Sequence, residues 1–139
     1  MLGKLIAHHM LLKYKTNDLV LPQAIIPVPL HPSRQYERGF NQAEELARQI
    51  AKNLNCSLDI HLISRNLNNP KQSGLDARQR KKNVKGIFKL NKNQKTYQHV
   101  AIVDDVMSTG STVNEISKLL KKAGVEKIDI WILARASHH

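Results

Sequence analysis

The sequence has 139 residues, of which 41% are hydrophobic and 4% aromatic, and its formal net charge is +11. This length fits one globular domain with a real core, and the recurring apolar runs argue against intrinsic disorder. The apolar runs are too short to span a bilayer, no secretory signal is visible, and the single cysteine excludes an intrachain disulfide and a cysteine zinc cluster, so we expect a cytoplasmic protein without membrane contact.

The excess positive charge is concentrated in one segment. Residues 61–100 hold ten Lys/Arg and one acid, whereas residues 1–60 hold seven against five and residues 101–139 hold five against five. The basic segment is also rich in Asn, Gln, Gly and Ser, which is typical of a loop. Such a loop indicates a polyanionic partner, either a phosphorylated small molecule or nucleic acid. The alternative is a solvated loop that only aids solubility.

The first half of the chain predicts a strand, a loop and a helix in that order. The strand AIIPVPL (24–30) is broken at its end by prolines, which cannot donate to a sheet. After the loop HPSRQYERGF, apolar residues recur at helical spacing over 43–54, and Asn41 with Glu44 resembles a capping pair. The next apolar run, LDIHLI (58–63), predicts a second strand.

The second half repeats this alternation. GIFKL (86–90) predicts a strand that returns from the basic segment, and VAIV (100–103) is continuously apolar, as expected for a central parallel strand covered on both faces. A helix follows, in which Thr112 and Glu115 form a capping box and which Gly124 ends.

A final strand is predicted by IDIWILA (128–134). The alternation of strands and helices favours a three-layer α/β domain with a mainly parallel sheet and right-handed crossovers, formed by residues 1–137. His138 and His139 resemble the remnant of an affinity tag.

Two acids and a hydroxyl-rich turn follow the predicted central strand directly. A loop between the carboxyl end of a parallel strand and the next helix is where open α/β sheets bind ligands, and backbone N–H groups at the helix start favour an anion. Gly110 lets the backbone approach a phosphate, whereas Asp104 and Asp105 suit a pair of sugar hydroxyls or a metal-bound water. Neutral donors to phosphate oxygens are the hydroxyls of Ser108, Thr109, Ser111 and Thr112. A ribose 5-phosphate meets both demands.

The whole stretch VAIVDDVMSTGST (100–112) resembles the phosphoribosyl pyrophosphate (PRPP) signature of type I phosphoribosyltransferases. In that family the acids hold the ribose 2- and 3-hydroxyls and the following loop holds the 5-phosphate. The resemblance implies that Asp104 and Asp105 are the catalytic ribose ligands. It assigns PRPP binding to Val106, Met107, Ser108, Thr109, Gly110, Ser111 and Thr112. The alternative is a chance pair of acids before a helix cap.

Two further stretches are similar to signatures of the ComF/GntX group, which is named for roles in competence for DNA uptake and in gluconate utilisation. They are PVPLHPSRQYERGFNQAEELA (27–47) and PKQSGLDARQRKKNVKGIF (70–88), and the resemblance extends from about Leu5 to Ala136. Many members carry an N-terminal four-cysteine zinc module. This sequence lacks that module, so no zinc function is implied.

The same resemblance gives roles to two loops. The loop after the first strand is expected to hold pyrophosphate through Leu30, His31, Ser33 and Arg34, with assistance from Arg38, although His31 has a structural role as its alternative. The segment 65–85 corresponds to the flexible loop that closes over the reacting centre, and its candidate phosphate ligands are Lys71, Arg78, Arg80 and Lys81. Closure excludes water from the cationic ribosyl carbon. The expected cofactor is Mg²⁺, held mainly by PRPP and at most through water by Asp104 or Asp105.

We therefore expect Mg²⁺-assisted transfer of a phosphoribosyl group from PRPP to a nitrogen nucleophile. The acceptor stays open: Trp131, Phe88, Tyr97 and Tyr36 are candidates to stack on a base, but such side chains more often fill a core or an interface. One alternative is a PRPP-binding regulator without turnover. The other is an accessory protein of DNA uptake that contacts single-stranded DNA or a DNA-processing partner. A homodimer also stays open.

Overall fold

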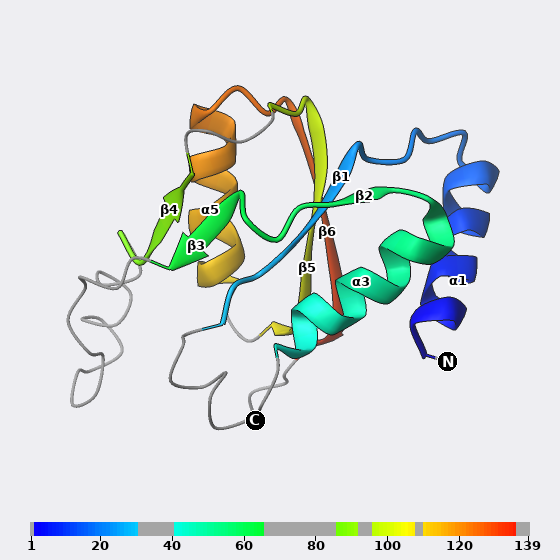
Figure 1. Cartoon of the computed structure of the whole chain (residues 1–139). Coiled ribbons are helices and arrows are strands. Elements are labelled where there is room, and N and C mark those ends of the chain that lie inside the picture. The colour runs from blue at the N-terminus through cyan, green and yellow to red at the C-terminus, as the bar shows by residue number, and fades with distance from the viewer. Residues whose placement is uncertain (1, 31–40, 66–85, 92–95, 108–109, 136–139) are drawn as a thin grey trace.

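The computed structural model describes residues 2–30, 41–65, 86–91, 96–107 and 110–135 (Figure 1). In chain order the elements are α1 (Leu2–Thr16), β1 (Ala24–Pro27), α3 (Gln42–Leu54), β2 (Ser57–Leu58), β3 (Ile63–Arg65), β4 (Phe88–Leu90), β5 (His99–Met107), α5 (Ser111–Lys122) and β6 (Lys127–Arg135). Helix α1 is not among the elements that the sequence predicted. Within the described ranges, no helix combines the length and the apolar character that a bilayer span requires.

The main sheet is parallel, and β5 lies inside it. Its four strands follow the order β2-β1-β5-β6, and each neighbouring pair is parallel. This arrangement confirms the central parallel strand predicted for residues 100–103. Parallel strands end at the same edge of a sheet, so the residues that follow β1 and β5 lie on one side of the domain. In the register of this pair, Pro27 at the end of β1 lies opposite Val103 of β5.

Both faces of this sheet are covered, which gives the predicted three layers. Along β1, Ile25 packs towards α1 and α3, whereas Ile26 packs towards α5 and the β3–β4 pair. Figure 1 shows α1 and α3 on one side of the sheet and α5 with β3 and β4 on the other. Ile50 of α3 and Ile116 of α5 are fully buried on the two sides, so burial on both faces explains the continuously apolar strands.

The single strand predicted for residues 58–63 is wrong, because a buried turn divides it. The Asp59 carboxylate accepts hydrogen bonds from the backbone N–H groups of His61 and Leu62, both at 3.0 Å. It also accepts one from the Tyr97 hydroxyl at 2.9 Å. After this turn, β3 leaves the main sheet and pairs antiparallel with β4, which was predicted within residues 86–90.

Asn41 confirms the predicted start of α3 and ties it to β1. Its side-chain oxygen accepts from the N–H groups of Ala43 at 3.0 Å and Glu44 at 3.3 Å. Its amide nitrogen donates to the carbonyl oxygen of Val28 at 3.1 Å, just beyond β1. One cap residue therefore fixes both the helix start and the end of the neighbouring strand.

The capping box predicted for α5 is wrong, because the helix begins earlier. Its N-cap is Gly110, with a φ of 81° and no side-chain cap, so Thr112 lies inside the first turn. Glu115 pairs with Lys118 at 3.2 Å instead of reaching back to the helix start. Gly124, with a φ of 103°, follows the C-cap and confirms the predicted end of the helix.

Candidate functional site

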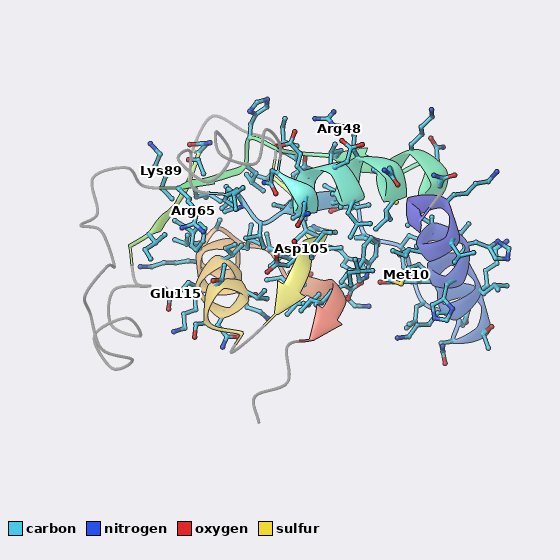
Figure 2. The ribbon with its side chains drawn as sticks, turned by 90° about the horizontal axis from the view of Figure 1, so that it is seen from below. Met10, Arg48, Arg65, Lys89, Asp105 and Glu115 are labelled. Carbon is cyan, nitrogen blue, oxygen red and sulfur yellow. The ribbon has the colours of Figure 1, made fainter. Side chains whose placement is uncertain are left out.

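The candidate site lies at the carboxyl end of β5. Asp104 and Asp105 belong to this strand, and both side chains are half-buried. Figure 2 shows Asp105 near the end of the strand, with α3 on one side and α5 on the other. The buried residues Ile102 and Val103 precede the acids and anchor the strand in the core. The two predicted ribose ligands thus lie in β5 just beyond the level at which the neighbouring strand β1 ends.

The environment of Asp104 opposes its charged form. Its Oδ1 accepts a hydrogen bond from the backbone N–H of Asp105 at 2.9 Å. The pKa of Asp104 is raised to about 6, first by burial, then by the side-chain hydrogen bond with Asp105 and by repulsion from the Asp105 carboxyl. The hydrogen bond from the Asp105 backbone and the positive charge of Arg65 lower this pKa. Two adjacent carboxyls with one strongly raised pKa are more typical of a functional site than of a packed core.

The start of α5 provides the part of the site that suits an anion. Gly110 is the N-cap, and the first turn of the helix contains no acid. Ser111 and Thr112 are half-buried in this turn, and the buried side chain of Val113 fixes it to the core. A helix start of this kind directs backbone N–H groups and the positive end of the helix dipole outwards.

Only some of the predicted site residues can be located. Leu30 lies half-buried shortly after β1, and Val106 and Met107 complete β5. The other predicted loop residues lie outside the described ranges: His31, Ser33, Arg34, Arg38, Lys71, Arg78, Arg80, Lys81, Ser108 and Thr109. The roles assigned to them stay predictions.

The described aromatic candidates for an acceptor site serve the fold. Trp131 is buried, and its Nε1 donates to the Tyr14 hydroxyl at 3.3 Å. Tyr97 donates to Asp59, and Phe88 is buried in the core between α5 and the β3–β4 pair. These positions agree with the core alternative, and Tyr36 lies outside the described ranges.

Arg65 is a site residue that the sequence did not single out. It was predicted as the first residue of the flexible loop, but it is the last residue of β3. Its Nε donates to the carbonyl oxygen of Pro29 at 2.9 Å, and its charge acts on Asp104. The contact joins residues 36 positions apart, so no local pattern indicates it.

Comparison with known proteins agrees with the geometry. Residues 38–139 match the family described as phosphoribosyl transferase domain. The chain is 49% identical over 124 residues to competence protein F of Haemophilus influenzae, covering 88% of this chain and 54% of that protein. It is 39% identical over 134 residues to the DNA utilization protein YhgH of Shigella flexneri, covering 96% of this chain and 59% of that protein. The chain thus spans little more than half the length of these curated relatives.

A solved structure supports the same fold. The hypoxanthine phosphoribosyl transferase of Trypanosoma cruzi has a TM-score of 0.56 and 16% sequence identity, covering 98% of this chain and 72% of that chain. At this identity the likeness concerns the fold alone. The predicted type I phosphoribosyltransferase fold and the resemblance to ComF proteins are confirmed.

Proposed function

The chain belongs to the phosphoribosyl transferase domain family, and from this membership we propose that it binds PRPP with Mg²⁺ and transfers the phosphoribosyl group to a nitrogen nucleophile. The observation that carries the proposal is the pair of half-buried carboxyls, Asp104 and Asp105, in the last part of β5, the strand that precedes Gly110 and the start of α5. The acids suit the ribose diol, and the helix start suits the 5-phosphate. Competence and DNA utilization proteins among the relatives support a link of this activity to DNA uptake.

In the proposed reaction the nitrogen lone pair forms a bond to C1 of the ribose. The bond between C1 and the pyrophosphate oxygen breaks, its electron pair leaves with pyrophosphate, and the nitrogen loses its proton to solvent. Positive charge develops on the sugar ring, so nearby carboxylates stabilise the transition state as well as orient the diol. Asp104 is half-ionised near pH 6 and becomes mostly charged for this role only above that pH.

The described residues fit a shared Mg²⁺ ion. Asp104 and Asp105 offer oxygen donors, and Mg²⁺ usually combines one or two carboxylates with substrate phosphates and waters. Among the described residues there is no group of three or more His, Cys, Asp or Glu that could hold a metal ion by itself. When bound, Mg²⁺ neutralises phosphate charge and makes pyrophosphate a better leaving group.

Calorimetric titration with PRPP and Mg²⁺ tests the binding step. We expect the double variant Asp104→Asn, Asp105→Asn to lose PRPP affinity while it keeps the fold. The matched control is Glu45→Gln with Glu126→Gln, which makes the same chemical change at two exposed acids. PRPP affinity that is unchanged in the site variant would refute the assignment of the acids.

Turnover needs a separate assay. Pyrophosphate release is measured with ammonia and a panel of nucleobases, and release that depends on one acceptor supports the transferase. PRPP binding without release from any acceptor instead supports a PRPP-binding regulator, which the same fold can accommodate.

A second candidate function is contact with single-stranded DNA. It is favoured by the ten Lys/Arg in residues 61–100 and by the competence and DNA utilization relatives. Binding of an oligonucleotide is then expected to weaken steeply with salt. It should be lost when five residues are neutralised together: Lys71, Arg78, Arg80, Lys81 and Lys82.

A further inference from the structure

Two contacts fix the side chain of Arg65 at the base of the candidate site. Its Nε donates to the carbonyl oxygen of Pro29 at 2.9 Å, and its guanidinium carbon lies 5.0 Å from the ring centroid of Phe88. Phe88 is also its partner in the antiparallel pairing of β3 with β4. The flat guanidinium can donate in its plane while its face stacks on a ring, which a lysine cannot do.

Arg65 acts both on the end of β1 and on Asp104 of β5. Pro29 directly precedes Leu30, where the predicted pyrophosphate loop begins. On the other side, the positive charge of Arg65 favours the charged form of Asp104 against burial and against Asp105. Asp105 on β5 and Arg65 on β3 are the charged groups that act on Asp104 among the described residues.

We propose that Arg65 is a positioning residue of the candidate site, which holds the carboxyl end of β1 through Pro29. The consequence for ligand binding rests on the proposed function. The effect on β1 is a property of the protein alone, so it is measured without a ligand.

The test compares Arg65→Gln, which removes the charge, with Arg65→Lys, which keeps the charge but not the paired contacts. The control is Arg48→Gln, because Arg48 is an exposed residue of α3 that pairs with Glu44 at 2.7 Å and loses the same charge. Figure 2 shows Arg48 on the outer side of α3.

The first measurement is hydrogen exchange, without PRPP, at the Val28 amide, which donates to the carbonyl oxygen of Val103 at 2.9 Å just beyond β1. Both Arg65 variants should exchange this hydrogen faster by about threefold or more, because the strand end loses its contact with Arg65. Exchange as slow as in Arg48→Gln would overturn the structural part.

The second measurement is PRPP affinity at pH 7.5 with Mg²⁺. We expect about tenfold weaker binding for Arg65→Gln and a smaller loss for Arg65→Lys. Unchanged affinity in Arg65→Gln, with wild-type protein that binds PRPP, would overturn the role in ligand binding. If the wild type does not bind PRPP, the proposed function fails, whereas the hydrogen-exchange measurement still decides whether Arg65 positions β1.

Discussion

Replacing Asp104 with Asn should remove PRPP binding and stabilise the fold at the same time. Asn keeps an acceptor oxygen for the N–H of Asp105, which now lies 2.9 Å from Asp104 Oδ1, but it carries no charge. In the folded protein the pKa of Asp104 is raised from 3.8 to about 6, mainly by burial. The charged form is therefore less favourable in the folded state than in the unfolded chain.

The pH dependence and the magnitude follow from these two values. Well below pH 3.8 the Asp104 carboxyl is protonated in both the folded and the unfolded state and does not oppose folding. Between pH 3.8 and about 6 the unfolded chain loses this proton first, so the destabilisation of the fold grows with pH and reaches its full size above about pH 6. Raising a pKa from 3.8 to about 6 corresponds to about 3 kcal/mol. Because the side chain is only half-buried and solvent screens it, we expect Asp104→Asn to gain about 1–2 kcal/mol at pH 7.5.

Urea unfolding of the wild type and of Asp104→Asn at about pH 4 and pH 7.5 measures this gain. The difference in the free energy of unfolding should be small at the lower pH and large at the higher one. Glu126→Gln, an acid-to-amide change at an exposed position, should show no such dependence. A variant that is no more stable than the wild type at pH 7.5 would refute the electrostatic argument.

Three further predictions concern residues that hold the fold around the site. Asp59→Ala should lower the free energy of unfolding by about 2–4 kcal/mol, because three hydrogen-bond donors lose their acceptor. In the same variant the pKa of Tyr97, which burial and Asp59 raise to about 12, should fall in a spectroscopic titration. Asn41→Ala should lose about 1–2 kcal/mol in urea unfolding, because the cap of α3 and the bond to Val28 both disappear. Ile116→Ala should lose about 2–5 kcal/mol in the same assay, since the side chain is fully buried. Losses below about 0.5 kcal/mol would contradict each assignment.

The sequence predicted those parts of the fold that depend on burial or on neighbouring residues. Val100 to Val103 are all buried because the sheet is covered on both faces, so their apolar run carries the signal of a central strand. The cap formed by Asn41 depends on the residues directly after it and could be recognised from them. The two acids follow the apolar run directly, but β5 continues through them to Met107, so the sequence predicted the end of the strand too early.

The errors arose where distant contacts or backbone geometry decide the structure. The apolar run at 58–63 contains Asp59, which accepts hydrogen bonds and forms a turn where a strand was predicted. One of its donors is Tyr97, 38 residues later, so no local pattern indicates this role. The Thr112–Glu115 pattern matched a capping box, but the positive φ of Gly110 places the helix start before it. Helix α1 escaped prediction because charged and polar residues interrupt its apolar positions.

Asp59 and Asp104 show how an acid that supports the fold differs from one that suits a ligand. Asp59 is buried, but donors from the backbone of its own turn and from Tyr97 compensate its carboxylate. Asp104 is half-buried, but its strongest neighbour is another acid, and the backbone N–H of Asp105 compensates its charge only in part. A diol would supply the missing donors. The same burial that destabilises Asp104 in the ligand-free protein should therefore strengthen its hydrogen bonds to a bound sugar, since buried charged hydrogen bonds exceed exposed ones in strength.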